Sequence, residues 1–174
     1  MSESIIRGRS EPLGWYWRFE TRRGELGRLL GLPDEVEVVH NALLDEGERN
    51  VLDVYFRNNL APANFFLGLH SGALAETHTL TNVVEPSQSG YARQQIARNT
   101  TDWGAPALDA GDYKTTASQE SFAAAATWTP VNECFLASTS GGTSGSVILS
   151  AALSTFRSLV SGDTLNVTLS VKAQ

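Results

Sequence analysis

The sequence predicts a mainly β protein: an antiparallel, jelly-roll-like β-sandwich with one helix and an extended N-terminal arm. Three observations carry this prediction. Beyond residue 60, short runs of alternating apolar and polar residues are separated by turn residues, which is typical of a sandwich. Helical spacing is found in one substantial stretch, at about residues 46–58. Residues 1–33 contain too few aliphatic side chains for a core of their own, so we divide the chain into this segment and a sandwich domain, 34–174.

The composition limits the class of protein. The 174 residues are 41% hydrophobic and 18% charged, which suits one globular domain. The formal net charge of −6 argues against nucleic acid as the partner. A single cysteine, Cys134, excludes an internal disulfide and a cysteine-based zinc site. The start does not resemble a secretion signal and no window is apolar enough to span a membrane, so we expect synthesis in a cytoplasm.

The first 33 residues have three interpretations. Arginines interleaved with the aromatic run at 15–19 favour an arm that lies across another subunit. Arginine and aromatic side chains also stack on bases, so a nucleic-acid arm is an alternative. The third interpretation is a first β-hairpin of the main domain, with strands at 15–19 and 26–32. In the arm interpretation, deletion of residues 1–33 leaves a folded domain.

Residues 34–58 predict a short strand followed by the helix. Val36, Val38 and Val39 are β-branched and indicate the strand. Asp45, with Glu48 three residues later, fits a capping box at the start of the helix. Apolar residues then recur at helical spacing, and asparagine and proline residues end the helix near residue 58.

The rest of the chain predicts strands. Residues 164–172 alternate strictly between apolar and polar side chains, which indicates a half-buried strand, and residues 64–70 form another candidate. The glycine- and serine-rich run at 138–145 and residues 161–163 predict turns. The other candidate strands are 80–84, 91–98, 112–117, 121–128, 131–137 and 147–153.

The strand expected at 91–98 is polar on both faces, with Tyr91, Arg93 and Gln95 on one side and Arg98 on the other. Such a strand cannot lie in a dry core. We expect it at a sheet edge or beneath another chain, with arginine stems packed flat and their head groups hydrogen-bonded. Its polar side chains are either donors at an interface, meeting the acidic segment 34–58 of the same or a neighbouring subunit, or an internal ladder that sets strand register. A charge swap at Arg93 that alters assembly but not melting would favour the interface.

The residue patterns favour neither catalysis nor a bound cofactor or metal. Asp109 and Asp112 bracket a turn, and the acidic residues at 45–48 suit a helix start. Cys134 lies in an apolar strand and is expected to be a buried, inert thiol. We therefore expect that the protein is not an enzyme. Three histidines lack the spacing of a metal-binding helix and are expected to be solvated or at interfaces: His40, His70 and His78.

Five segments follow one another in the sequence: HNALLDEGERNVLDVYFRNN, APANFFLGLHSG, GYARQQIARNTTDW, AGDYKTT and GDTLNVTLSVKAQ. In this order they resemble small virion structural proteins of tailed bacteriophages, a family that includes head-decoration, head-fibre and tail proteins. In that family a helix, a phenylalanine-rich strand, a polar strand and an amphipathic last strand follow one another. The resemblance covers about residues 40–174 and does not include the first 33 residues.

The resemblance implies a non-enzymatic component of a virion assembled in the host cytoplasm, with other virion proteins and copies of itself as partners. We expect a subunit that decorates or cements the capsid. A neck or tail protein is one alternative, and a glycan- or receptor-binding fibre module is another. A glycan platform would use Tyr113, Trp103 or Trp128, although the residues around Trp128 favour a core position. The residues expected at partner interfaces are Arg7, Arg9, Trp15, Tyr16, Trp17, Arg18, Arg22, Arg23, Tyr91, Arg93, Gln95 and Arg98.

Overall fold

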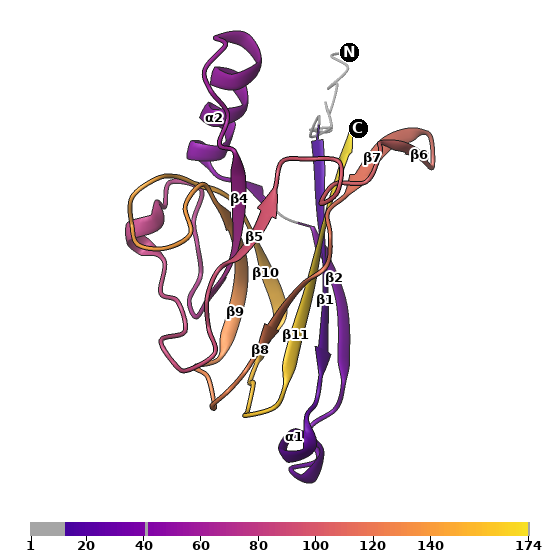
Figure 1. The fold of residues 1–174 in the computed structure, drawn as a ribbon, viewed down its shortest axis with the longest axis vertical. Helices are drawn as coiled ribbons and strands as arrows, with labels where there is room; N and C mark the ends of the chain where they lie inside the picture. Colours follow the sequence, from indigo (N-terminus) through magenta and orange to yellow (C-terminus); the bar gives the residue numbers. More distant parts are fainter. Residues whose placement is uncertain (1–12, 41, 174) are drawn as a thin grey trace, which may run out of the picture.

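The computed structural model describes residues 13–40 and 42–173, and in these residues the chain forms two antiparallel sheets. The sheets face each other as the two layers of a sandwich, which confirms the predicted fold class (Figure 1). Residues 1–12, with the predicted interface residues Arg7 and Arg9, lie outside the described residues, as do residues 41 and 174.

The larger sheet has six strands and is built around the pairing of β1 with β11. These two strands pair antiparallel along ten residues, from Leu13 opposite Ala173 to Arg22 opposite Thr164. In sheet order the strands are β2 (Glu35–His40), β1 (Leu13–Arg22), β11 (Thr164–Ala173), β7 (Asp112–Thr116) and β6 (Ala107–Asp109), and β8 (Glu120–Ala123) also pairs with β11.

The smaller sheet has five strands, and its edge strands are short. In sheet order they are β3 (Ala42–Leu43), β10 (Val147–Arg157), β9 (Val131–Ala137), β4 (Asn64–His70) and β5 (Gln94–Ala97). The predicted turn at 138–145 joins β9 to β10, and the turn at 161–163 precedes β11. Most of the predicted strands are therefore confirmed, whereas β3 and β6 are too short for the alternating pattern to reveal them.

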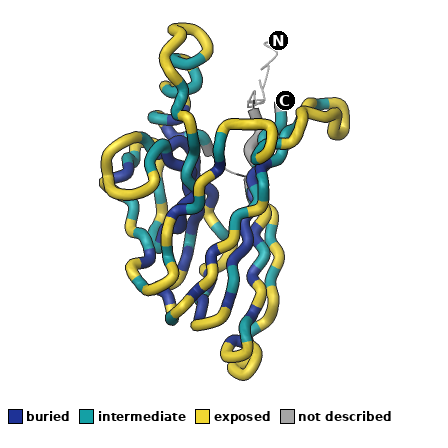
Figure 2. Tube along the Cα trace, viewed as in Figure 1, coloured by how far each residue is buried: buried dark blue, intermediate teal, exposed yellow. Residues whose placement is uncertain are grey.

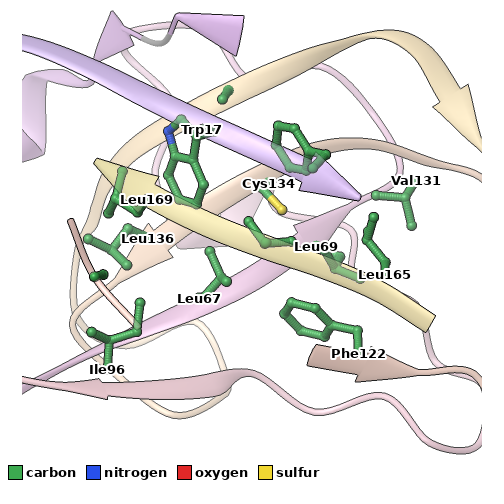
Figure 3. Close-up of a cluster of buried hydrophobic side chains, with 14 of the residues drawn as sticks. Trp17, Leu67, Leu69, Ile96, Phe122, Val131, Cys134, Leu136, Leu165 and Leu169 are labelled. Carbon is green, nitrogen blue, oxygen red and sulfur yellow. The ribbon is translucent and has the colours of Figure 1, made fainter. Parts of the chain in front are cut away.

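The core lies between the two sheets and is filled by the alternating apolar residues of both (Figure 3). Trp17 and Phe19 of β1 are fully buried, with their rings stacked 6.3 Å apart. Leu165 and Leu169 of β11 bury the same face of the larger sheet. From the smaller sheet come the leucines of β4 and the side chain of Cys134, whose predicted burial is confirmed. Burial raises the pKa of the Cys134 thiol well above its usual value.

The smaller sheet is buried on its outer face as well. Phe135 and Ala137 of β9 point away from the main core and pack with Leu44, Leu80 and Val147 in a second apolar cluster. A strand that is buried on both faces does not alternate between apolar and polar residues. This explains the continuous apolar run at residues 134–137 of β9. A Cβ atom at Gly68 would lie 2.2 Å from the Phe135 ring, so glycine is required at that position of β4.

Helix α2 (Asp45–Phe56) confirms the predicted helix, but the predicted cap is wrong. The N-cap residue is Leu44, and no side chain caps the helix. Leu44 is buried in the second cluster and its N–H donates to the carbonyl oxygen of Ile148 at 3.1 Å, so tertiary contacts set the helix start.

Two further local predictions need correction. A short second helix, α1 (Glu25–Leu29), lies between β1 and β2, where the sequence analysis expected one helix in the whole chain. The strand expected at 80–84 is a 3₁₀ turn, Leu80–Asn82, closed by hydrogen bonds between Thr79 and Asn82. Leu80 enters the second cluster from this turn, and burial of one side chain does not require an extended strand.

Residues 13–33 are not an arm separate from the sandwich, as the arm interpretation of residues 1–33 expected. These residues form β1 and α1, and β1 pairs with β2 across the proposed boundary at residue 33. The hairpin interpretation describes this segment, although its second strand is Glu35–His40 and α1 occupies the expected position, 26–32. Deletion of residues 1–33 would remove an inner strand of the larger sheet with two buried aromatic rings, so the structure favours an unfolded remainder in place of the folded domain expected from the sequence.

The two ends of the long axis differ from the body of the sandwich. Helix α2 and the β6–β7 hairpin project at one end, where β11 finishes, and α1 lies at the other end (Figure 1). Exposed residues gather on these projections, whereas buried residues follow the strands (Figure 2). The sandwich therefore presents its projecting elements at its ends.

Substitution of Trp17 tests the position of β1. We expect Trp17→Ala to lower the free energy of unfolding by about 3–5 kcal/mol, because it empties a fully buried site. Arg18→Ala is the matched control: Arg18 is the next residue, on the opposite face, and its guanidinium pairs at the surface with Glu20 at 2.9 Å. Denaturant unfolding of both variants is the measurement, and equal effects would contradict a core position for β1.

Candidate interaction surface

The structure divides the predicted interface residues whose side chains it describes into three groups. Trp17 is a core residue. Arg23, Tyr91 and Arg93 form contacts inside the chain. Trp15 lies in β1 opposite Val171, and its side chain is outside the described part of the structure. The group that reaches the surface, wholly or in part, is Tyr16, Arg18, Arg22, Gln95 and Arg98.

Arg93 is the centre of an internal network. Its guanidinium donates to both carboxylate oxygens of Glu85, at 2.9 and 2.8 Å, and to the carbonyl oxygens of Thr139 and Gly142, each at 2.9 Å. It also lies over the Phe135 ring, 5.1 Å from the centroid. Arg93 is thus a buried tie between two loops and not a surface donor, and its partner is Glu85 and not a residue of the acidic segment 34–58.

Tyr91 extends the same network into the core. Its hydroxyl donates to Glu85 and accepts a hydrogen bond from the N–H of Leu69 at 3.0 Å. Its ring packs against Phe122 and against the edge of Trp128, so Trp128 is a core residue, as the sequence favoured. Burial and the Glu85 carboxylate raise the pKa of Tyr91 well above its usual range, because both disfavour the phenolate.

Arg23 forms a second buried tie, next to α1. Its guanidinium donates to the Asp163 carboxylate at 2.8 Å and to the carbonyl oxygens of Ser158 and Pro33 at 2.6 and 2.9 Å. Asp163 also accepts from the N–H of Gly24 at 2.8 Å. The pair therefore fixes the β1–α1 connection against the turn that precedes β11.

The polar strand is at the sheet edge, as predicted. β5 is the last strand of the smaller sheet, and it is limited to Gln94–Ala97. Arg98 follows it, lies over the Phe65 ring at 5.6 Å and donates to the carbonyl oxygen of Pro62 at 3.1 Å. This is the flat packing and hydrogen bonding expected of the arginines in this segment.

A groove of about 460 Å³ lies beside Arg98, between α2 and the ends of the strands. Helix α2 contributes Val51, Val54 and Tyr55 to one wall. The opposite wall includes Phe65 of β4 and Ile148 of β10. The groove is therefore apolar along both walls, and Arg98 stands at its margin.

The second half of α2 forms an apolar ridge next to this groove, defined here as Leu52, Tyr55, Phe56 and Leu60. Leu52 is 56% exposed, Tyr55 and Phe56 are each 80% exposed, and Leu60 in the following loop is 99% exposed. The predicted interface residues did not include them, because helical spacing also suits a face that packs on the protein's own core. Their signal was that apolar residues occupy more of the helix surface than one packing face needs.

The histidines and carboxylates singled out in the sequence have structural surroundings. His70 is buried, contrary to the expected solvated or interface position, and its Nδ1 accepts a hydrogen bond from the N–H of Val84 at 2.9 Å. Burial lowers the pKa of His70. Asp109 and Asp112 flank the β6–β7 turn, where Ala110 and Gly111 have positive φ, as expected for turn residues. Within the described ranges, no group of three or more potential ligands could hold a metal ion.

No helix in the described part of the chain is long and apolar enough to cross a membrane.

Removal of Arg93 should weaken the fold. We expect Arg93→Ala to lower the free energy of unfolding by about 3 kcal/mol, because it removes the guanidinium that pairs with Glu85 and that donates to two carbonyl groups. Arg98→Ala is the matched control and should cost less than about 1 kcal/mol, because Arg98 is exposed. Thermal melting of the two variants checks the difference, and an Arg93 variant that melts like the natural chain would contradict the network.

Glu133 should make stability depend on pH. It is buried, with its carboxylate accepting from the N–H of Leu74 at 3.0 Å, and burial raises its pKa. A raised pKa adds stability below the unfolded value, 4.5, and this stability is lost as pH rises through the folded value. We therefore expect Glu133→Gln to melt at a higher temperature than the natural chain at pH 7, with the difference shrinking as pH falls towards 4.5. A difference that is constant with pH would contradict this assignment.

Comparison with known proteins identifies the family. Residues 42–171 match the family described as podophage GP4 fiber I protein gp80. The match runs from β3 into β11 and includes the whole smaller sheet, α2 and the groove, whereas β1 and β2 precede it. A search of curated proteins found no match. The family places the protein in the virion, in association with other virion proteins. The match confirms the resemblance to structural proteins of phage virions. The chain therefore belongs to the podophage fiber I protein family and is a structural protein of a tailed phage.

Proposed function

We propose that this chain is a subunit of a virion fibre, held in place by protein–protein contacts and without catalytic activity. The observation that carries the proposal is the family match, because it covers residues 42–171 and thus most of the sandwich. We propose the fibre role in preference to the capsid-decoration role expected from the sequence, because the description of the matched family is that of a fibre protein.

The buried charges support a mechanical role. Arg23 pairs with Asp163, Arg93 with Glu85, and Arg157 with Glu35 and Glu37 at 2.7 and 2.6 Å. Each of these arginines joins segments that are separate in the sequence, and each lies almost wholly out of solvent. A buried guanidinium that holds several acceptors fixes the geometry of the loops around it. Rigid loops of this kind suit a subunit that has to keep its shape within a particle.

The end that carries α2 and the β6–β7 hairpin supports attachment through one end of the molecule. The ridge side chains at this end are exposed in the isolated chain, and the charged residues Arg49, Asp53 and Arg57 lie on the same helix. Exposed apolar surface with a polar rim is typical of a protein–protein contact. We propose that the contacts that hold the subunit use this end.

A glycan-binding role at a fibre tip has less support. Trp128 is buried in the core and Trp103 is half-buried beside the groove. Tyr113 on β7 is the exposed member of the three residues expected in a sugar platform. One exposed ring supplies less stacking surface than the several aromatic rings expected of a platform, so we retain the structural role as the proposal.

Phage particles that lack this chain test the proposal. We expect negative-stain images of such particles to show intact heads without one set of fibres, and gold label on this chain to mark fibres in normal particles. Copy number per particle, from quantitative mass spectrometry, should match the number of fibres. Heads that become unstable, together with hundreds of copies per normal particle, would contradict the fibre proposal and indicate capsid decoration.

A further inference from the structure

The groove beside α2 lies next to the point where the described chain begins. Val171 of β11 lines the groove, together with side chains of α2, β4 and β10. Val171 pairs with Trp15 of β1, and Leu13, the first residue of β1, pairs with Ala173. β1 begins at the end of the molecule where α2 projects (Figure 1). The residues that precede β1 in the sequence are therefore tied to the chain beside the groove.

The described residues leave this groove open to solvent. A Cβ atom at Gly47 would lie 1.9 Å from the carbonyl oxygen of Ile148, so α2 touches β10 closely at its first turn. Val51 and Val54 lie further along the helix, line the groove and are partly exposed, and Tyr55 at its margin is 80% exposed. The groove volume of about 460 Å³ falls within the range of roughly 300–1,000 Å³ found for pockets that hold a ligand.

The sequence before β1 contains an apolar pair that matches the groove. Residues 1–12, which lie outside the described residues, read MSESIIRGRSEP. Ile5 and Ile6 are the two branched aliphatic residues of this segment, and the remainder is largely polar. Burial of branched aliphatic side chains against the apolar walls of the groove is favourable.

The charges of α2 complement the arginines that follow this pair. The first turn of the helix carries three acidic residues, and Asn50, which lines the groove, comes four residues after Glu46. The arginines at 49 and 57 already lie beside Asp53, at 3.8 and 2.9 Å, so they leave the first turn negative. Residues 5–9 read IIRGR and carry two positive charges. Opposite charges that border an apolar contact fix the orientation of a bound segment.

We propose that residues 5–9 bind in the α2 groove of their own chain, with Ile5 and Ile6 against its apolar walls and the two arginines beside the acidic first turn. Six residues separate Ile6 from Leu13, so the segment reaches up to roughly 23 Å at about 3.3 Å per residue. The groove spans only about 6 Å of the helix axis between Val51 and Tyr55. A tether this short gives an effective concentration in the millimolar range, which favours the chain's own segment over that of another copy.

This contact gives Arg7 and Arg9, two of the predicted interface residues, a partner within the chain. The ridge residues Leu52 and Phe56 are not among the residues that line the groove, so they stay exposed when the groove is filled. Residues 5–9 would thus cover the apolar groove and leave the ridge available to other virion proteins. The proposal does not rest on the fibre assignment.

A pair of cysteines in the full chain tests the contact. Ile6→Cys lies in the proposed segment and Val54→Cys on the groove wall, while the natural Cys134 is fully buried. Mild oxidation should form a disulfide within one chain, detected by mass spectrometry after alkylation of the free thiols. Adding Ile5→Ser should slow this reaction at least about tenfold, since burial of an isoleucine contributes at least the roughly 1.4 kcal/mol that corresponds to a factor of ten. Reversing both charges, with Arg7→Glu and Arg9→Glu, should also slow it.

Ser4→Ala is the matched control on the other side of the apolar pair, and it should leave the rate of disulfide formation unchanged. Ile6→Cys with Phe156→Cys measures the effect of the tether alone, because Phe156 is 62% exposed on β10 and does not line the groove; this pair should link much more slowly. Melting temperatures check that the variants fold, and Tyr55→Cys at the exposed margin replaces Val54→Cys if the latter lowers the melting temperature. Equal rates with Ile5→Ser and Ser4→Ala, or disulfide-linked dimers in place of internally linked chains, would overturn the proposal. Neither result would change the images of virion fibres, so the fibre assignment is tested separately.

Discussion

The ten-residue pairing of β1 with β11 is the interaction on which the rest of the structure depends. It joins the first described strand to the last, and it places β2 on one side and β7 and β8 on the other. The inner faces of the two strands supply Trp17, Phe19, Leu165 and Leu169 to the core. Because the chain must close this pairing over its full length, both ends of the described chain meet at the same end of the molecule (Figure 1). The hairpin β1–β2 precedes the family match, yet the sandwich core is not complete without it.

Buried arginines give this sandwich its rigid connections. Arg23, Arg93 and Arg157 each satisfy several acceptors with one planar group, which a lysine ammonium could not do with the same geometry. The sequence contains 13 basic residues, and only Lys114 and Lys172 are lysines. Arg23 and Arg93 were expected at interfaces with other chains, and the contacts described here lie within the chain.

The end with α2 contrasts with this closed body. β9 buries apolar residues on both of its faces, whereas Leu52, Tyr55 and Phe56 in the second half of α2 are exposed to solvent. A segment whose apolar surface is left exposed by a well-packed fold is the natural place for a partner. The body therefore serves to hold the shape, and the projecting end is where the contacts of a virion subunit are expected.

The sequence by itself determined the elements whose pattern is local. The alternation in β11, the phenylalanine- and leucine-rich β4, the turns at 138–145 and 161–163 and the helix near 46–58 follow from side-chain period and turn residues, and they indicate a sandwich. The polarity of 91–98 also located an edge strand correctly. Tertiary structure alone decided which arginines are buried, because a guanidinium has the same local pattern whether its acceptors come from its own chain or from another. Tertiary structure also decided that Trp17 is a core residue and that α2 begins after Leu44. Trp17 is buried by the pairing with β11 and Leu44 donates to Ile148 of β10, and both partners are more than 100 residues away in the sequence.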